Sequence, residues 1–208
     1  MKTGVSVYTI AECAQQMGEE ALKVFLQGFA CPLNEEVEQF LKDKAQQSTR
    51  LSSSVTYLVW GDEYQELIGY FTLMMKAYSV ESGQLSSKNR NLIQRFAEVD
   101  GSGKFVAPVY LIAQLGKNFA IPKERLPTGT ALLRYALGLF RGTKKVLGGK
   151  LVMVEREADC PKLQEFYTKN GFKSWTRRIN EKDGKPAVEF DQMFAVLNDE
   201  PPTGGPGS

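Results

Sequence analysis

The feature that most constrains the fold is an apolar run, FVAPVYLIAQL, at residues 105–115. It carries no charged residue and is rich in aliphatic and aromatic side chains, which is typical of a central strand buried on both faces. The irregular stretch GKNFAIPKERLP follows, and a helix is predicted to start at Thr128 or Thr130 and to end near Gly142. The fold must therefore contain a buried strand that leads through a loop into a helix.

Helical and strand-like segments alternate around this unit. Two strand-like runs, 55–60 and 66–77, are separated by a short polar turn and predict an antiparallel hairpin. With no repeat and no linker before residue 198, the sequence predicts a single α/β domain over 1–198 and a flexible tail over 199–208. The other predicted helices are 12–27, a helix capped by Asn34, 86–98, and a helix from Asp159 to Gly171; the other predicted strands are 5–10, 147–155, 172–178 and 188–197.

The chain contains no histidine, which removes several classes of chemistry at once. A Ser-His-Asp or Cys-His nucleophile system requires histidine, and so does a His-ligated zinc or iron site. No CxxC pair offers another set of metal ligands, so we expect no metal. Any general acid or base must be Tyr, Glu, Asp, Lys, Cys or water.

The composition predicts a globular cytoplasmic protein with no membrane partner. Apolar residues make up 42% of the chain and charged residues 24%. No apolar run approaches the roughly 20 residues that cross a bilayer, and the N-terminus lacks the apolar stretch of a secretory signal. The three cysteines are too few and too scattered for a disulfide framework, which favours reduced thiols.

The charge of the chain is unevenly distributed. Residues 114–150 contain eight basic side chains and one acid, a local charge of +7 in a chain whose net charge is only +2. A basic field of this size suits a phosphorylated ligand or a nucleic acid. A solvated helix face with a lysine-rich loop explains the same charge run without any ligand.

The predicted helix start at Thr128-Gly129-Thr130 is a candidate phosphate site. A helix N-terminus presents free backbone N–H groups and the positive end of the helix dipole. Gly129 allows a ligand to approach the backbone, and Lys123 and Arg125 add positive charge. A glycine that only completes a turn is the alternative interpretation.

A second candidate is the segment FYTKNGF at residues 166–172. Phe166 and Phe172 are predicted core residues, and Gly171 is predicted to terminate the helix. The hydroxyl of Tyr167 is the best acid that a chain without histidine offers near such a cleft. The alternative is a tyrosine that covers the core and hydrogen-bonds to water.

Together these features resemble the GNAT family of acetyl-CoA-dependent N-acetyltransferases. The resemblance runs from the N-terminal helices through PVYLIAQLGKNF and PTGTALLRYAL to KLVMVE and LQEFYTKNGFKSW. The front of the chain, FACPLNEEVEQFLKDKAQQS followed by TYLVW and ELIGYFTL, is similar to GNAT-type toxins that acetylate the amino group of aminoacyl-tRNA. The resemblance implies the GNAT fold, an α/β fold whose mixed central β-sheet is flanked by helices.

The resemblance also implies acetyl-CoA as co-substrate, although the binding loop departs from the family pattern. In the pattern Q/R-x-x-G-x-G/A, the final glycine is Gly129, the first glycine is replaced by Pro127, and the Q/R position holds Glu124. Proline removes a backbone donor, and a carboxylate repels phosphate. Binding of the diphosphate is therefore expected to rely on the amides of Thr128, Gly129 and Thr130, and on Arg125.

In the mechanism that the resemblance implies, an amine attacks the thioester directly. The backbone of Leu115, Gly116 and Lys117 would hold the thioester carbonyl and the pantetheine arm, and an N–H group there would stabilise the oxyanion. Tyr167 would protonate the departing thiolate. Glu155, or Glu157, is the candidate base, with a solvated strand end as the alternative role.

Two function classes remain open from the sequence. One is an acetyltransferase whose acceptor is charged tRNA, or else a small-molecule or protein amine. The other is a GNAT-fold binding module with weakened cofactor binding, which Glu124 and Pro127 favour. A toxin would also have an antitoxin protein as partner, and a homodimer is a further expectation.

Overall fold

The structure is a computed structural model that describes residues 4–180 and 187–198. The chain forms two compact units, unit 1 (Met1–Met74 and Ile112–Ala136) and unit 2 (Met75–Leu111 and Leu137–Ser208). The chain passes from one unit to the other within the strands β3 (Glu66–Glu81) and β5 (Lys104–Lys117) and within the helix α6 (Gly129–Leu147). A single domain over 1–198 remains a prediction.

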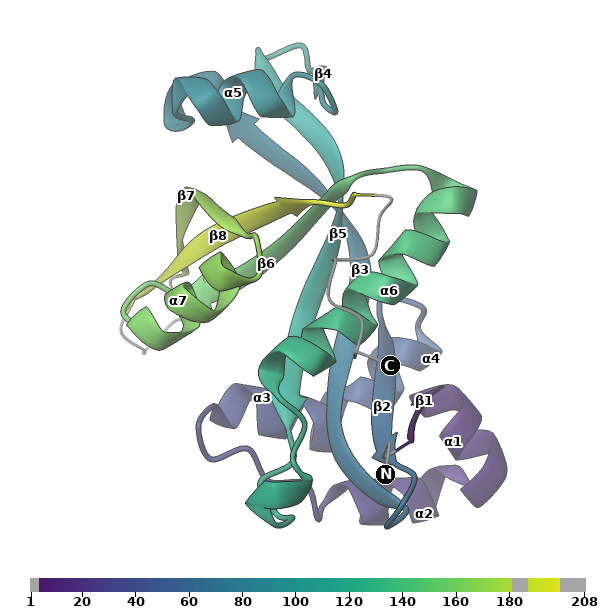
Figure 1. The fold of residues 1–208 in the computed structure, drawn as a ribbon. Coiled ribbons are helices and arrows are strands. Elements are labelled where there is room, and N and C mark those ends of the chain that lie inside the picture. The colour runs from purple at the N-terminus through teal and green to yellow at the C-terminus, as the bar shows by residue number, and fades with distance from the viewer. Residues whose placement is uncertain (1–3, 181–186, 199–208) are drawn as a thin grey trace, which may run out of the picture. The chain divides into compact units, whose positions relative to one another are not determined.

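The described residues form one sheet of eight strands (Figure 1). Its order is β1-β2-β3-β5-β6-β8-β7, and β4 pairs with β5 outside this path. The strands β3 and β5 are long because each contributes to both units. The remaining strands are β1 (Val5–Thr9), β2 (Val55–Gly61), β4 (Glu98–Val99), β6 (Leu151–Glu157), β7 (Lys173–Asn180) and β8 (Val188–Val196).

Unit 1 combines an antiparallel meander with short helices. The pairs β1–β2 and β2–β3 are antiparallel, which confirms the predicted hairpin, and a bulge lies between Val59 and Trp60. A core of aliphatic and aromatic side chains joins the helices to β2 and β3. The helical elements are α1 (Ile10–Met17), α2 (Glu19–Leu26), α3 (Glu35–Gln39), the π-helix η1 (Phe40–Lys44) and α4 (Ala45–Arg50).

The ends of the first helices follow local capping chemistry. Thr9 and Glu12 form a capping box that starts α1 at Ile10, earlier than predicted. The prediction of one helix over 12–27 is wrong, because Gly18 has a φ of +88° and separates α1 from α2. The Asn34 side chain accepts a hydrogen bond from the Val37 N–H, which confirms Asn34 as the cap of α3.

In unit 1 the first half of α6 packs closely on β3 because Gly69 has no side chain. A Cβ atom at Gly69 would lie 2.7 Å from the Gly116 carbonyl oxygen and 2.9 Å from Cδ1 of Leu132. The glycine therefore lets β5 and α6 approach β3 closely. Figure 1 shows α6 on one face of these strands and α1–α4 on the other.

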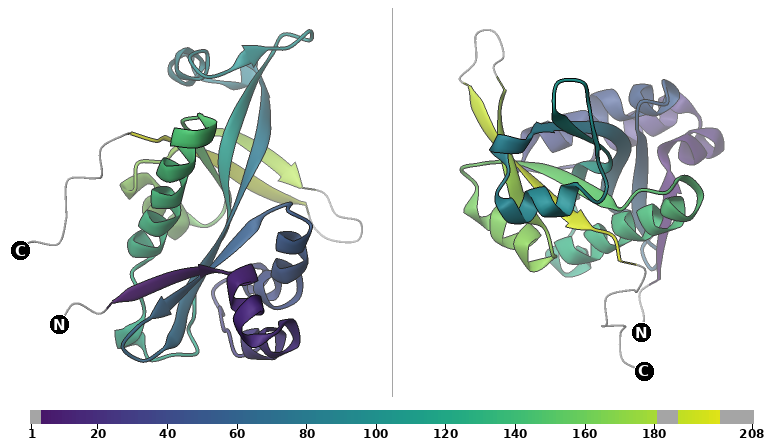
Figure 2. Two further views of the ribbon diagram at one scale, coloured as in Figure 1. Left: turned by 90° about the vertical axis from the view of Figure 1, so that its right-hand side faces the viewer. Right: turned by 90° about the horizontal axis from the view of Figure 1, so that it is seen from above.

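In unit 2 the far ends of β3 and β5 form a ribbon. The 3-10 helix η2 (Ser82–Gln84), the helix α5 (Ser87–Ile93) and β4 connect the two strands at that end (Figure 2). The prediction of a helix over 86–98 is confirmed at its start, where Ser86 is the N-cap. It is wrong at its end, because α5 stops at Ile93. The segment following α5 instead forms β4, which pairs with Phe105 and Val106 of β5.

The second part of unit 2 contains β6, β8 and β7, which pair antiparallel in that order, together with α7 (Pro161–Lys169). The predicted strand 147–155 lies at Leu151–Glu157, because α6 extends past Gly142 to Leu147. Cys160, not the predicted Asp159, is the N-cap of α7, since Pro161 occupies the first helical position, where no N–H is required.

The predicted tail at 199–208 lies outside the described residues. None of the helices among the described residues combines the length and the hydropathy that a membrane span requires.

Candidate functional site

The end of β5 carries three predicted site residues in unit 1: Leu115, Gly116 and Lys117. Gly116 is buried, and a Cβ atom there would lie 2.6 Å from Cγ1 of Val37 and 3.0 Å from the Tyr70 ring. The backbone at this point is therefore enclosed too tightly for any side chain. Lys117 keeps its ammonium 5.2 Å from the centre of the Phe119 ring.

The residue that follows β5, Asn118, connects three segments of unit 1. Its side-chain oxygen accepts hydrogen bonds from the N–H groups of Ala30 and Ala120, each at 3.1 Å. Its amide nitrogen donates to the Leu67 carbonyl at 2.8 Å. Asn118 is buried, and both its side-chain oxygen and its side-chain nitrogen form hydrogen bonds. It therefore determines where the loop after β5 begins.

Arg125 lies in the loop that precedes α6, on the 3-10 helix η3 (Lys123–Arg125). Its Nη1 donates to Oε1 of Glu66 at 2.8 Å, and its guanidinium stacks 4.1 Å from the centre of the Tyr64 ring. The prediction that Arg125 grips a diphosphate therefore meets a competing carboxylate. A phosphate ligand would have to share this guanidinium with Glu66.

The start of α6 agrees with the predicted helix start. The Thr128 hydroxyl accepts a hydrogen bond from the Ala131 N–H at 3.1 Å, as an N-cap does, and Gly129 and Thr130 form the first turn. Within the described residues no acceptor bonds the N–H groups of Thr128 and Gly129. These donors lie at the positive end of a 19-residue helix, where an anion such as a phosphate group is favoured.

Tyr167 lies on α7 in unit 2 and is buried, with 8% of its surface exposed. Its ring makes edge-to-face contacts with Phe166 and Phe172, with ring centres 5.0 Å and 5.5 Å away. Burial raises the pKa of the Tyr167 phenol to about 12. The phenol is therefore protonated at neutral pH and able to donate a hydrogen bond.

The end of α7 explains the spacing of the FYTKNGF segment. The Phe172 N–H donates to the Tyr167 carbonyl and the Gly171 N–H to the Thr168 carbonyl, both at 3.0 Å. With Gly171 at a φ of +89°, these bonds form a Schellman motif, and the Tyr167–Phe172 contact is the apolar contact that accompanies it. The motif thus has a structural cause in addition to any role in chemistry.

Glu155, the predicted base, lies within β6 and not beyond its end. Its carboxylate accepts hydrogen bonds from Nε and Nη2 of Arg178 at 3.2 Å and 3.1 Å, and from Gln192 at 2.7 Å. Burial alone would raise the pKa of Glu155, but the bonds from Gln192 and Arg178 outweigh it and lower the pKa below 4.5. A carboxylate held in this way is a weak proton acceptor, so the structure gives no support to a base role.

The predicted residues thus fall into two groups. Unit 1 holds the strand end, Arg125 and the start of α6, whereas unit 2 holds Tyr167 and Glu155 on different elements. Sequence reasoning missed Asn118 and Arg156, the buried polar residues at the ends of β5 and β6. The signal for Asn118 is an asparagine directly after an apolar strand, and for Arg156 an arginine directly after the predicted strand 147–155.

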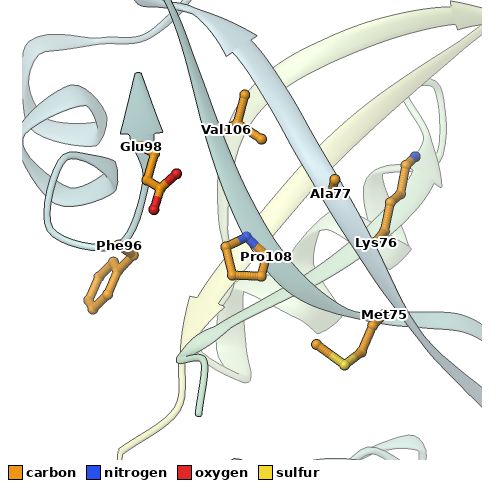
Figure 3. Close-up of a pocket in the computed structure, with 7 residues that line it drawn as sticks. All are labelled: Met75, Lys76, Ala77, Phe96, Glu98, Val106 and Pro108. Atoms are coloured by element: carbon orange, nitrogen blue, oxygen red, sulfur yellow. The ribbon is translucent and has the colours of Figure 1, made fainter. Parts of the chain in front are cut away.

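A cavity of about 550 Å³ lies elsewhere in unit 2. Met75, Lys76 and Ala77 of β3, Val106 and Pro108 of β5, and Phe96 and Glu98 line it (Figure 3). None of the predicted site residues lines it.

Comparison with known proteins identifies the fold. No family model and no curated protein matches the chain. Among solved structures, AtaT complexed with acetyl-methionyl-tRNAfMet is 17% identical, with a TM-score of 0.59, over 90% of this chain and 95% of that chain. A structure described as a bacterial toxin is 19% identical, with a TM-score of 0.61, over 94% and 92%.

A third structure is a tyrosine-to-phenylalanine mutant of the toxin AtaT bound to the C-terminus of the antitoxin AtaR and to acetyl-CoA. It is 16% identical, with a TM-score of 0.55, over 90% of this chain and 92% of that chain. The chain therefore has the fold of GNAT-type toxins, as its sequence predicts.

Proposed function

Given that the chain has the GNAT-toxin fold, we propose that it is an N-acetyltransferase that moves an acetyl group from acetyl-CoA to a primary amine. The observation that carries the proposal is the fold likeness to toxins solved with acetyl-CoA and with acetylated aminoacyl-tRNA, in a chain that keeps Tyr167 on α7. The acceptor that we favour is the α-amino group of an aminoacyl-tRNA.

Unit 1 supplies the binding groups for acetyl-CoA in this proposal. The N–H groups of Thr128 and Gly129 would hold the diphosphate, and Thr130 lies in the same first turn. Arg125 would add positive charge once its ion pair with Glu66 opens or is shared with the phosphate. The backbone of Leu115–Lys117, enclosed around Gly116, would hold the thioester carbonyl and donate to the oxyanion.

The reaction forms one bond and breaks one. The neutral amine nitrogen attacks the thioester carbonyl carbon, the C–N bond forms, the C–S bond breaks, and the electron pair leaves on the CoA sulfur. The nitrogen loses one proton and the sulfur gains one. An aminoacyl ester amine has a lower pKa than a lysine side chain, so water is a sufficient base and no role is assigned to Glu155.

Tyr167 is the proposed hydrogen-bond donor to the departing sulfur. Its pKa of about 12 lies above that of an ordinary thiol, about 8.5 for cysteine, so complete transfer of the phenol proton to a thiolate is uphill. The phenol would therefore stabilise the developing negative charge through a charge-assisted hydrogen bond. This refines the expectation that Tyr167 protonates the thiolate.

Two features favour charged tRNA over a small amine or a protein amine. One solved relative of this fold is bound to acetyl-methionyl-tRNAfMet, and the segment 114–150 carries a charge of +7. The toxin relative bound to an antitoxin extends the proposal to a protein partner that binds and inhibits this chain.

The test is transfer of radiolabelled acetyl from acetyl-CoA to a mixed pool of aminoacyl-tRNAs, with uncharged tRNA and α-N-formylated aminoacyl-tRNA as acceptor controls. Tyr167→Phe should lower kcat about 100-fold, within the range for losing one hydrogen-bond donor that stabilises developing negative charge. Tyr8→Phe is the matched control, because Tyr8 is 44% exposed on β1, and it should be unchanged.

The outcomes separate the parts of the proposal. A Tyr167→Phe rate within a few-fold of wild type would remove Tyr167 from the mechanism. Transfer to polyamines or lysine peptides but not to aminoacyl-tRNA would change the acceptor. With tRNA as acceptor, kcat/KM should fall steeply as salt rises.

A binding module with the same fold is the second candidate, favoured by the Arg125–Glu66 pair and by Pro127, which has no N–H to donate. Calorimetry with acetyl-CoA distinguishes it. Measurable heat supports the enzyme, and no heat at millimolar ligand would replace the enzyme with the module.

A further inference from the structure

A buried ion pair joins the strands of unit 2 that precede and follow α7. Nη2 of Arg156 on β6 lies 2.7 Å from Oδ2 of Asp191 on β8, and the two side chains are 2% and 3% exposed. The two residues are direct cross-strand partners. The Ser174 hydroxyl on β7 donates to the same carboxylate, so three strands meet at Asp191.

The other arm of the Arg156 guanidinium holds the segment between β6 and α7. Nη1 donates to the carbonyl of Glu157 at 2.7 Å and to that of Ala158 at 3.2 Å, and it reaches the Cys160 carbonyl at 3.5 Å. Cys160 is the N-cap of α7. One planar side chain therefore ties the sheet to the start of this helix.

The Arg156–Asp191 pair fixes the geometry of the segment between β6 and α7 more than it stabilises the fold. A buried ion pair is often no more stabilising than a pair of well-packed apolar side chains, because both charges lose their hydration. Nε of Arg156 is buried and has no partner among the described residues, which adds to that cost. A planar guanidinium holds its N–H donors in a rigid fork, so it can bond two sets of acceptors at fixed angles. An ammonium is a compact charge without such a fork.

The helix transmits this geometry to Tyr167. Tyr167 lies six residues after Pro161, a rise of about 9 Å along a continuous helix. The Schellman motif at Gly171 fixes the other end of α7, so a displacement of the segment 157–160 tilts the helix and moves the phenol. We propose that Arg156 is a positioning residue that places Tyr167 by holding the segment 157–160; this inference rests on the proposed acetyltransferase function.

Arg156→Lys tests the proposal because it retains a charge beside Asp191 but loses the fork that bonds the loop carbonyls. In transfer of acetyl to the aminoacyl-tRNA pool, kcat should fall about tenfold, while KM for acetyl-CoA changes less than about twofold. Arg177→Lys is the matched control, because Arg177 on β7 forms an exposed pair with Glu189 on β8, and its kcat should be unchanged.

A double-mutant cycle separates positioning from a general structural effect. In the Tyr167→Phe background, Arg156→Lys should change kcat by less than about twofold, because the group that it places is already absent. The same tenfold loss in both backgrounds would overturn the proposal.

Hydrogen exchange measures the geometry without any activity. Arg156→Lys should speed amide exchange in a peptide covering residues 157–169 at least about fivefold, while a peptide covering β8 stays unchanged. Unchanged exchange at 157–169 would overturn the proposal. If Arg156→Lys does not fold, Ser174→Ala leaves the pair in place and should lower kcat about threefold with the same exchange signature, and the absence of both effects would overturn it.

These measurements also distinguish the two layers of inference. A Tyr167→Phe enzyme with nearly full activity defeats the proposed role of Tyr167, whatever Arg156 does. A weak Tyr167→Phe enzyme beside a fully active Arg156→Lys enzyme defeats only the positioning role.

Discussion

Asn118 in unit 1 and Arg156 in unit 2 solve the same problem with different chemistry. Each is a buried polar residue at the end of a strand, and each bonds the loop that leads to a helix with predicted site residues. Asn118 is neutral, and its oxygen and nitrogen bond three backbone groups. Arg156 is charged, requires Asp191 as a counter-ion and leaves Nε unpartnered.

The difference indicates how each unit should respond to perturbation. A neutral amide loses only its own hydrogen bonds when it is removed, whereas removing one member of a buried ion pair strands the other charge. Unit 2 also contains the half-buried Glu155–Arg178 pair. We therefore expect unit 2 to be the more sensitive unit to single substitutions and to acid.

The largest effect is expected for Asp191→Ala, which leaves the Arg156 charge buried without a counter-ion. The free energy of unfolding in urea should fall by about 3–5 kcal/mol. Replacing both residues, Arg156→Met with Asp191→Leu, should recover most of that loss because no charge remains buried. A loss below about 1 kcal/mol for Asp191→Ala would contradict the interpretation.

Asn118→Ala should be less costly, because only neutral groups lose their partners and water can reach some of them. We expect the free energy of unfolding to fall by about 2 kcal/mol. Asn91→Ala, at an exposed position of α5, is the control and should change it by less than about 0.5 kcal/mol. A larger loss at Asn118 than at Asp191 would reverse the comparison.

The smallest effect is the acid response of Glu155. Because its folded pKa lies below the ordinary 4.5, the ionised carboxylate stabilises the fold above pH 4.5, and this stabilisation is lost as pH falls through the folded pKa. The gap in urea midpoint between wild type and Glu155→Gln should therefore narrow from pH 7 to pH 3. The difference in urea midpoint between wild type and Asn118→Ala should stay the same over this pH range, since an amide does not titrate. Equal narrowing for the two substitutions would contradict the expected difference between the units.

Most of the architecture was predictable because it follows from local patterns. The strand at 105–115, the hairpin of β2 and β3, the Asn34 cap and the glycine-terminated helix of Tyr167 each depend on residues that are close in sequence. The errors were also local. The prediction of one helix over 12–27 fails at Gly18, and the predicted Asp159 cap lies one residue too early, because Pro161 occupies the first helical position rather than a later place in the first turn.

Sequence patterns alone predict the order of most elements, exclude histidine-dependent chemistry, and point to the candidate groups around Gly129 and Tyr167. The partners of those groups were decided only by tertiary structure. The two members of each pair lie far apart in the sequence: 59 residues for Glu66 and Arg125, 23 for Glu155 and Arg178, and 35 for Arg156 and Asp191. Charge, burial and pKa at a site depend on such distant contacts, and neither composition nor periodicity encodes which of them form.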